Sequence, residues 1–522
     1  MKSRKIEQIY CQKLKFNDDT ELLLEKDSIV VFTGANNSGK SQVLKEIERC
    51  MHGNNREGII VKDYEVKYIR YVNETFGTCE YIVTNKETYK YVDDVKKQIN
   101  AWEECELDGE HLKDVINRLS TERRLNSSDA MSRLHDVGHH PIYKLHEDEP
   151  LCQKISDYFN DAFGVDLVLN PGEMNTIPLH VGKGPDKTKY TMDKRTEYCN
   201  EVKKLPKLQE QGDGMRSFAG VLLNSFTSNY SVNLIDEPEA FLHPPQARIL
   251  GRMLVENNPA DRQLFIATHS EDFLQGLLDA NYKNLTIIRI SRENDANRMN
   301  VLKNEKIKEL WKNSIMRYTN ILSGLFHEKV VICESDYDCL FYHALINAVY
   351  EKQSKIAPDI LFTHCGGKGR MKDIVSALKV VNVPVVSICD FDLLNEKRTF
   401  KDLASAFNID WKSSLEDDMK IIYDGMNARN SKGYDAWAEI KTIGSAGFKG
   451  AEPAAYEKVE AECKNAGLFV VPVGELECFD KTVSKEKKDW VYYMLENYDL
   501  ATYSKLEGAR NFISEVLNFV IK

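Results

Sequence analysis

The residues with the most recognisable chemistry lie in a glycine-rich loop near the start of the chain. Residues 34–41, GANNSGKS, fit the pattern G-x-x-x-x-G-K-[ST] without a mismatch, between an apolar run at 29–33 and a helical pattern. The backbone N–H groups of such a loop can surround phosphates, the lysine adds charge, and the serine hydroxyl can ligate Mg²⁺. We therefore predict that ATP and its magnesium ion are bound by Gly34, Asn36, Asn37, Gly39, Lys40 and Ser41.

Two carboxylates follow a second apolar run and could form the other half of an ATPase site. The run at 232–235 ends in Asp236, which would hold Mg²⁺, and Glu237, which would polarise the attacking water. An isolated Asp-Glu pair is more often part of a solvated turn. Here, however, residues 236–244 (DEPEAFLHP) resemble the Walker B motif and D-loop of ABC-type ATPases related to chromosome-maintenance and double-strand-break-repair proteins. That resemblance implies that His269, after the apolar run 265–267, senses the γ-phosphate.

ABC-type ATPases complete the nucleotide site of one subunit with a signature motif from another, which implies a homo-oligomer of at least two subunits. The candidate motif at 211–217, QGDGMRS, departs from the family's LSGGQ because Gly212 stands where a phosphate-contacting serine is expected. Either Ser217 or backbone amides could replace that serine. The charged segment 101–135 predicts helices, and residues 101–150 are either a helical dimerisation insert or a solvated surface.

Acidic residues end three apolar runs in the second half of the chain. The run at 329–333 leads into Glu334, with Asp338 soon after, and the run at 385–389 leads into Asp390 and Asp392. In an extended segment, residues i and i+2 point the same way, so the last two acids are predicted to face one metal site. The stretch 468–477 ends in two more acids, Glu475 and Glu477. Clustered carboxylates repel one another unless cations neutralise them, which implies Mg²⁺ or Mn²⁺.

The order E-x-x-x-D, D-x-D and a late glutamate resembles the TOPRIM domain of OLD (overcoming lysogenization defect) nucleases. The resemblance implies that two metal ions activate water and stabilise the leaving oxygen. It assigns metal binding and catalysis to Glu334, Asp338, Asp390, Asp392 and Glu477, with Glu475 as the second choice for the last of them. The family also carries a late lysine, for which Lys505 is the candidate and Lys481, Lys485, Lys487 and Lys488 are alternatives.

A glycine-rich basic loop at 366–370, GGKGR, lies between these acidic segments. It could contact backbone phosphate through Lys368 and Arg370. A solvated turn is the competing interpretation.

The order of elements predicts an α/β protein with two domains. We expect an ABC-type P-loop ATPase domain at 1–326, with the helical insert at about 101–150, and a Rossmann-like TOPRIM nuclease domain at 327–522. This order resembles OLD-type enzymes, including Gabija-type and retron-associated nucleases. It implies an ATP-binding, metal-dependent DNA endonuclease in antiphage defence. The alternative is a nucleotide-gated sensor or scaffold whose TOPRIM domain acts only with a co-encoded partner protein or on RNA.

Composition narrows the class of protein further. The chain of 522 residues is too long for one hydrophobic core, and its net charge of -11 argues against a protein that merely coats nucleic acid. Its 12 cysteines include no CxxC pair, so a zinc ribbon is not expected and a reducing compartment is favoured. No apolar stretch is long enough to cross a membrane, so we expect a cytoplasmic protein without membrane partners.

Overall fold

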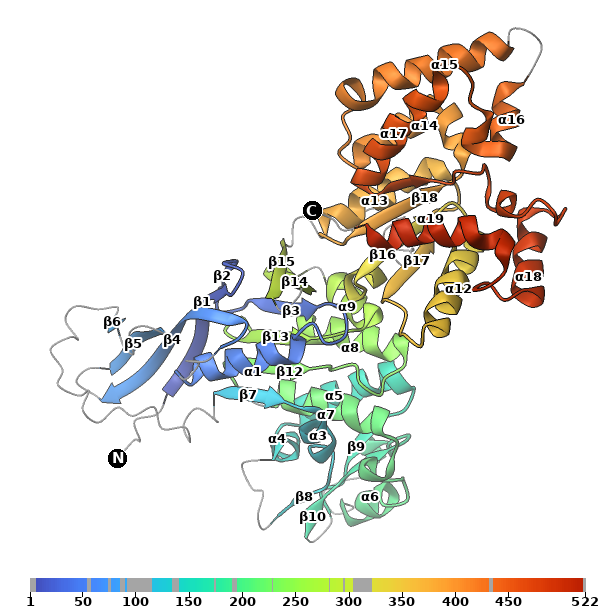
Figure 1. Cartoon of the computed structure of the whole chain (residues 1–522). Coiled ribbons are helices and arrows are strands. Elements are labelled where there is room, and N and C mark those ends of the chain that lie inside the picture. Colours follow the sequence, from blue (N-terminus) through green and yellow to red (C-terminus); the bar gives the residue numbers. More distant parts are fainter. Residues whose placement is uncertain are drawn as a thin grey trace. The chain divides into compact units, whose positions relative to one another are not determined.

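The computed structural model divides the chain into two compact units, Met1–Trp311 and Lys312–Lys522 (Figure 1). It describes residues 6–53, 58–73, 77–84, 90–91, 115–133, 140–172, 175–189, 195–227, 229–280, 282–293, 296–303, 322–430 and 435–519. The boundary expected from the sequence, between 326 and 327, falls inside the second unit and just before its first strand. Among the described helices, none is long and apolar enough to cross a membrane.

The first unit is built on a six-stranded sheet in the order β15-β14-β3-β13-β12-β7. The strands are β3 (Ile29–Thr33), β7 (Ile116–Leu119), β12 (Val232–Asp236), β13 (Gln263–Ala267), β14 (Leu285–Glu293) and β15 (Ala296–Lys303). All neighbours are parallel except β14 and β15. Every residue of β3 and β13 is buried, as expected for parallel strands covered on both faces. Parallel strands end at a common edge, so the segments that follow β3, β12 and β13 are brought together there.

A second, antiparallel sheet has the order β2-β1-β4-β5-β6. Its strands are β1 (Ile6–Phe16), β2 (Glu21–Leu23), β4 (Val61–Asn73), β5 (Gly77–Thr84) and β6 (Lys90–Tyr91). The helix α1 (Lys40–Met51) packs against both sheets: it contacts β1 and β4 of the antiparallel sheet and β12 and β13 of the six-stranded sheet. The Val-, Ile- and Tyr-rich stretches 61–73 and 77–84 form β4 and β5, as expected for residue types that favour strands.

The prediction that 101–135 is helical is wrong for part of that segment. Residues 101–114 and 134–139 lie outside the described ranges, but 116–119 form β7, which pairs with β12 inside the ATPase sheet. A two-residue strand, β8 (Met131–Ser132), also falls there, and within the described residues 115–133 only α3 (Thr121–Asn126) is helical. Strand pairing overrides the local charge pattern, because Ile116 and Leu119 are buried where the sheet needs an edge strand. Residues 115–119 therefore belong to the sheet rather than to an added helical insert.

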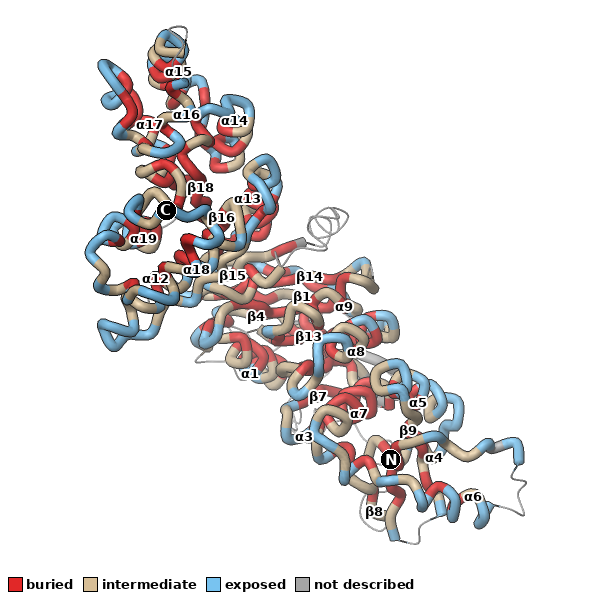
Figure 2. The backbone as a smooth tube through the Cα atoms, turned by 90° about the vertical axis from the view of Figure 1, so that its right-hand side faces the viewer, coloured by how far each residue is buried: buried red, intermediate tan, exposed pale blue. Residues whose placement is uncertain are grey.

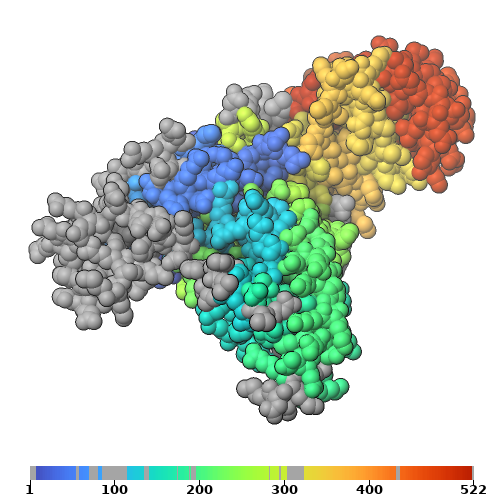
Figure 3. Space-filling model, turned by 90° about the horizontal axis from the view of Figure 1, so that it is seen from below, coloured from blue at the N-terminus to red at the C-terminus, as the bar shows by residue number. Residues whose placement is uncertain are grey.

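The rest of the first unit forms a lobe below that sheet, coloured cyan to green in Figure 3. Its elements are α4 (Pro141–Glu147), α5 (Glu149–Phe163), β9 (Leu167–Leu169), β10 (Thr176–Ile177), β11 (Leu179–Val181), η2 (Lys187–Lys189), α6 (Arg195–Val202), η4 (Leu208–Glu210) and α7 (Asp213–Phe226). Phe163 packs edge-on against Phe218, with ring centroids 5.3 Å apart, and so joins α5 to α7. Two further helices, α8 (Pro244–Glu256) and α9 (Glu271–Asp279), pack against each other after β12 and β13.

The second unit contains a parallel four-stranded sheet in the order β17-β16-β18-β19. The strands are β16 (Lys329–Cys333), β17 (Ile360–His364), β18 (Val385–Cys389) and β19 (Leu468–Val470), preceded by η5 (Leu322–Phe326). In Figure 2 the central strands of both units are buried. The strand order reverses between β16 and β18. Open α/β sheets bind their ligands outside the carboxyl ends of the strands at such a switch point.

Helices accompany this sheet, and half of those named below come from a long insertion between β18 and β19. The insertion holds η7 (Phe391–Asn395), α14 (Lys397–Ala406), η8 (Trp411–Leu415), α15 (Glu416–Asn430), α16 (Ala436–Ile443), η9 (Gly444–Gly447) and α17 (Glu452–Ala466). The remaining helices are α12 (Asp336–Lys352), η6 (Lys368–Arg370), α13 (Met371–Val380), η10 (Leu476–Phe479), α18 (Lys487–Asn497), η11 (Ser504–Leu506) and α19 (Glu507–Asn518). The predicted alternation of strands and helices is confirmed.

Candidate functional site

The glycine-rich loop lies between β3 and α1, as its sequence predicts. Gly34 has φ 143°, and a Cβ there would lie 2.2 Å from the carbonyl oxygen of Ile290, so no other residue fits. Gly39 has φ 102° and caps the start of α1. Asn297 on β15 donates a hydrogen bond of 2.6 Å to the carbonyl of Ser38 and holds the loop from outside. Asn36 and Asn37 are exposed, and the second has φ 62°.

The side chain of Lys40 is folded back onto this loop. It is buried, and its Nζ donates to the carbonyl oxygens of Gly34 and Ala35, at 2.9 Å in both cases. Burial lowers the pKa of the ammonium group, against the opposing charges of Glu237, Glu239 and Asp236. The lysine is therefore already positioned at the loop and could exchange two carbonyl partners for phosphate oxygens.

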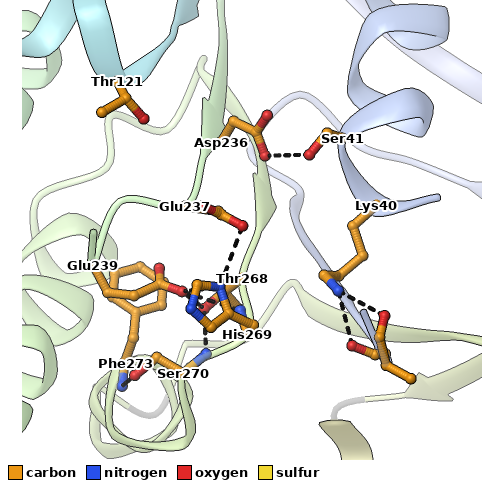
Figure 4. A network of polar contacts seen from close by, with 12 residues as sticks. Lys40, Ser41, Thr121, Asp236, Glu237, Glu239, Thr268, His269, Ser270 and Phe273 are labelled. Carbon is orange, nitrogen blue, oxygen red and sulfur yellow. Dashed lines mark hydrogen bonds and ion pairs between the residues drawn. The ribbon is translucent and has the colours of Figure 1, made fainter. Parts of the chain in front are cut away.

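Ser41 and Asp236 meet across the edge of the sheet (Figure 4). The Ser41 hydroxyl donates to Oδ1 of Asp236 at 3.0 Å. Burial raises the pKa of Asp236, which a nearby cation would lower again. A hydroxyl and a carboxylate at this separation can ligate the same magnesium ion, as the sequence predicts.

Glu237 and His269 also face each other at this edge, from the ends of β12 and β13. Glu237 adopts φ 47°, its backbone N–H donates to Ala267 at 2.8 Å, and its carboxylate lies 3.3 Å from Nδ1 of His269. A backbone in the left-handed region is unusual for glutamate and is typical of functional sites. The structure thus brings the candidate water-polarising and γ-phosphate-sensing residues into contact.

Two residues without an assigned role support this arrangement. The buried carboxylate of Glu239 accepts hydrogen bonds from the Thr268 hydroxyl at 2.7 Å and the His269 backbone N–H at 3.0 Å. The fully buried Arg124 donates to the carbonyls of Asp236 at 2.8 Å and Glu237 at 2.9 Å. Glu239 stands within the DEPE run and could have been noticed, whereas Arg124 lies in a charged segment that looks solvated.

The candidate signature motif begins α7, with Gly212 as its N-cap. Ser217 is fully buried, and its Oγ has no hydrogen-bond partner among the described residues. It lies on the helix face that also buries Phe218 and Val221, so it is not at the surface in this subunit. Of the two alternatives for the missing serine, backbone amides are favoured.

In the second unit, Glu334 and Asp390 end neighbouring strands and interact directly. The carboxylate of Glu334 accepts a hydrogen bond of 3.0 Å from the backbone N–H of Asp390. Burial and the neighbouring charge of Asp390 raise the pKa of Glu334 to about 8. Burial also raises the pKa of Asp390, to about 7, although Lys487 opposes that shift. These two acids lie at the switch point of the sheet.

Asp338 joins them through a lysine. Its carboxylate accepts hydrogen bonds from the Ser335 N–H and hydroxyl, at 3.0 and 2.8 Å, in a capping box at the start of α12. Lys487, at the start of α18, lies 3.0 Å from Asp338 and 2.8 Å from Asp390. Burial opposes the charge of this ammonium, but the two carboxylates outweigh burial and raise its pKa. Lys487 therefore neutralises two of the predicted metal ligands.

Asp392 lies in a helical turn, so the expectation of an extended D-x-D segment is wrong, although the charges of Asp390 and Asp392 both act on Glu334 and raise its pKa. The strand β18 ends at Cys389, and Asp390 caps the 3₁₀ helix η7 that contains Asp392. The helical turn directs Asp392 to another lysine, Lys368, whose Nζ lies 2.7 Å from it and 2.9 Å from Glu396. Lys368 belongs to the glycine-rich basic loop.

The two late glutamates follow β19. Glu475 pairs with Lys441 of α16 at 2.9 Å. Glu477 lies in η10, and its buried Oε2 has no hydrogen-bond partner among the described residues. Burial and then the charge of Glu475 raise the pKa of Glu477, while Lys487 opposes this shift. Lys505, the first candidate for the late lysine, is exposed on η11 and, in the part of the chain that the structure describes, forms no ion pair with these acids; its charge acts on Asp480.

Comparisons with known proteins agree with this division of chemistry. Residues 81–274 match the family described as "AAA domain, putative AbiEii toxin, Type IV TA system", and residues 325–392 match "Overcoming lysogenization defect protein-like, TOPRIM domain". A curated relative, the Old nuclease of Escherichia phage P2, is 28% identical over 169 residues. The chain has the ATPase–TOPRIM architecture of the OLD family.

The extent of these similarities differs between sequence and structure. The match to the Old nuclease covers 30% of this chain and only 27% of that relative. Among solved structures, an Smc head bound to the C-winged helix domain of ScpA is 13% identical, with a TM-score of 0.36, over 57% of this chain and 99% of that one. The SMC head domain from Thermotoga maritima is 12% identical, with a TM-score of 0.32, over 57% and 99% of the two chains.

The acidic residues of the OLD-like TOPRIM domain have the chemistry of a divalent-metal site. Oxygen donors suit Mg²⁺ and Mn²⁺. Burial, together with neighbouring carboxylates, raises the pKa values of Glu334, Asp390 and Glu477, and Oε2 of Glu477 has no hydrogen-bond partner among the described residues, so a bound cation would stabilise the charged form of these acids. In the described ranges, no three Asp, Glu, His or Cys side chains converge as a ready ligand set. The lysines account for this, because they draw Asp338 and Asp390 to one point and Asp392 to another.

Proposed function

We propose that this chain is an ATP-controlled, metal-dependent DNA endonuclease of the OLD type. The observation that carries the proposal is that Lys487 pairs with Asp338 and Asp390, which follow the neighbouring strands β16 and β18 at the switch point, and that its charge also acts on Glu477 after β19. The acids that would hold the metal ions are Glu334, Asp338, Asp390, Asp392 and Glu477. When bound, two Mg²⁺ or Mn²⁺ ions would supply an activated water and stabilisation of the leaving oxygen.

The chain's own residues divide the remaining work. Lys487 is half-buried between Asp338 and Asp390, where its ammonium group can stabilise negative charge on the phosphate being cleaved. We assign it the role of the family's late lysine in preference to Lys505, which contacts none of the acids. The Nζ of Lys368 lies 2.7 Å from Asp392. Once that carboxylate binds metal, the ammonium group of Lys368 can hold a substrate phosphate.

In the ATPase domain, Lys40 would bind the terminal phosphates and Ser41 with Asp236 would ligate Mg²⁺. Glu237 would orient the attacking water, and His269, 3.3 Å away, would contact the γ-phosphate. Gly34, Asn36, Asn37 and Gly39 complete the loop around the phosphates. We propose a homo-oligomer of at least two subunits, since the signature helix α7 can serve only the nucleotide of another subunit.

The biological setting is part of the same proposal. The resemblance to OLD-type enzymes and to a phage nuclease supports a cytoplasmic role in antiphage defence, with DNA as the substrate. We also propose that the ATPase domain ends at about residue 326 and that the nuclease domain follows it.

A second candidate function is a nucleotide-gated sensor or scaffold that cleaves only with a partner protein, or cleaves RNA. Two observations favour it. Gly212 stands where a phosphate-contacting serine is expected, and Ser217, its possible replacement, is buried. Lysines also occupy Asp338, Asp390 and Asp392. Neither observation removes an acid from the centre, so the nuclease remains the better-supported function.

Cleavage of supercoiled plasmid with Mg²⁺ or Mn²⁺, with and without ATP, tests the proposal directly. We expect nicking by the wild type and none by Asp390→Asn. Persistent absence of cleavage by the wild type in all four mixtures, with tRNA or a co-encoded partner restoring a reaction, would instead support the second candidate.

A further inference from the structure

A small basic pocket adjoins the acidic centre of the second unit. Its volume is about 210 Å³, and it is lined by Lys368, Gly369, Lys372, Arg398, Thr399 and Asp402. These residues come from the glycine-rich loop, the start of α13 and the first turns of α14. Pockets that enclose whole small molecules measure roughly 300–1,000 Å³, so this one suits a single phosphate group better than a nucleoside.

The charges around the pocket are mostly positive. Lys372 pairs with Asp402 at 3.0 Å, and Asp402 is the one carboxylate in the lining. The hydrogen bond from Lys372 lowers the pKa of Asp402, and the charges of Lys372, Arg398 and Lys401 lower it further. Arg398 is exposed and makes no ion pair within the described residues. A guanidinium without a carboxylate partner, beside two lysines, is suited to bind an anion.

The loop that forms one wall is open to a large ligand. Gly366 and Gly367 have φ of 63° and 120°, and a Cβ added at either glycine or at Gly369 would meet no atom within 4 Å. The loop therefore leaves room for a backbone to approach closely. It follows the carboxyl end of β17, at the edge of the sheet where the acids lie.

Lys368 connects the pocket to the acids. Its side chain lines the pocket, and its Nζ lies 2.7 Å from Asp392 and 2.9 Å from Glu396. A phosphate in the pocket would thus be separated from Asp392 by one side chain, that of Lys368.

We propose that this pocket binds a non-scissile backbone phosphate of the DNA strand and so sets the position of the cut. The proposal rests on the nuclease function and adds a site to it: Arg398 and Lys372 hold the neighbouring phosphate, and the acids act on the scissile one. Phosphate contacts of this kind fix the register of a strand and carry no base preference.

Binding measurements test this independently of cleavage. In an Asp390→Asn background with Mg²⁺, we would measure the affinity for a DNA duplex over a salt series, for Arg398→Gln, Lys372→Gln and the control Lys420→Gln, which removes an exposed charge of α15 outside the pocket. Each pocket variant should bind about 3- to 10-fold more weakly and lose about one unit of the salt slope, since each lost phosphate contact lowers that slope by about 0.9. Affinities and slopes equal to those of Lys420→Gln would overturn the proposal.

A neutral methylphosphonate placed at successive positions of one strand locates the contact. One linkage close to the cut should weaken binding to Asp390→Asn but not to the double variant with Arg398→Gln. If every linkage affects both proteins equally, the pocket does not bind the strand. If DNA binding depends on Arg398 but the wild-type protein never cleaves DNA, the phosphate pocket is supported and the nuclease function is rejected. The failure of one proposal can therefore be distinguished from the failure of the other.

Discussion

The two candidate sites of this chain differ in how their charges are arranged. In the ATPase domain, the catalytic lysine rests on carbonyl oxygens of its own loop, and Ser41 already meets Asp236 at 3.0 Å. In the TOPRIM domain, each group of acids is held by a lysine from a distant segment, Lys487 or Lys368. The first site already brings together the residues expected to bind the nucleotide and its magnesium ion, whereas in the second site lysines occupy carboxylates that are expected to bind metal.

This difference has a physical origin. A phosphate loop works through backbone N–H groups, whose direction is fixed by the fold around Gly34 and Gly39. An acidic centre works through side chains that repel one another, and that repulsion must be offset by any cation available. Lysines fulfil this function in the described structure, so the affinity of the centre for metal depends on residues outside the acidic motifs.

The largest effect is expected from removing a carboxylate at the switch point. Asp390→Asn should lower plasmid cleavage by about 10³-fold, of the order seen when a main transition-state group is removed, while ATP hydrolysis changes less than about twofold. Gel-based nicking and phosphate release measure the two activities. The control Asp417→Asn changes an exposed acid of α15 and should cleave normally. Equal loss of ATP hydrolysis in Asp390→Asn would mean that the variant is misfolded or that the sites are not separate.

The next effect concerns the lysine of the phosphate loop. Lys40→Met should weaken ATP binding by about 10- to 100-fold, because charge-assisted hydrogen bonds contribute about 1.5–3 kcal/mol each. Fluorescent-nucleotide titration measures the affinity. Lys45→Met, an exposed residue of the same helix, serves as the control. Unchanged ATP affinity in Lys40→Met would show that Lys40 keeps its hydrogen bonds to the loop carbonyls when nucleotide is bound. The backbone amides of the loop would then bind the phosphates without the lysine.

Much of both sites could be predicted from the sequence, and the failures have a common cause. Contiguous motifs located Lys40, Ser41, Asp236 and the acids at the strand ends, because strand and loop patterns fix where a chain turns. The geometry of Asp392 was missed, since a 3₁₀ helix begins directly after β18 and nothing in DFD shows this.

Pairings between distant segments could not be predicted. The choice between Lys487 and Lys505 depends on where α18 and η11 lie, which no local pattern reveals. Likewise, β7 was hidden in a charged segment, because its partner β12 lies more than a hundred residues away along the chain. Arg124 looks like an ordinary surface charge in the sequence. In the folded chain it donates hydrogen bonds to the carbonyls of Asp236 and Glu237.

The choice between the two lysines gives a sharper test of the acidic centre. Lys487→Met should reduce cleavage by about tenfold or more, since it removes the positive charge that pairs with Asp338 and Asp390 beside the proposed position of the reacting phosphate. Lys505→Met should cleave at close to the wild-type rate, because this exposed side chain contacts none of the acids. Plasmid nicking at saturating Mg²⁺ compares the two. A larger loss in Lys505→Met would return the late-lysine role to that residue.

The pH dependence of metal binding follows from the raised pKa values. Glu334 and Asp390 have folded-state pKa values of about 8 and about 7, above their ordinary values of 4.5 and 3.8. The metal-free protein should therefore lose stability as the pH rises through these values, and Mg²⁺ should offset that loss. We expect the Mg²⁺-induced rise in Tm to be small near pH 6 and to reach a few degrees near pH 8.5. Thermal scans with Mg²⁺ or EDTA measure it, and Glu334→Gln should flatten the profile.

The smallest effect is expected at the candidate signature motif of the ATPase domain, where either Ser217 or backbone amides could replace the missing serine. The buried hydroxyl of Ser217 has no partner among the described residues, so Ser217→Ala should leave ATP turnover within about twofold and should not lower Tm, because an unsatisfied buried polar group is removed. Gly212→Ser is the matched variant: Gly212 has φ −63° and a Cβ there meets no atom within 4 Å, so serine is tolerated as an N-cap. If Ser217→Ala abolished ATP turnover while the fold stayed intact, α7 would have to turn or unwind when a second subunit closes on the nucleotide, and the ATPase site would then share with the acidic centre the need to rearrange before it acts.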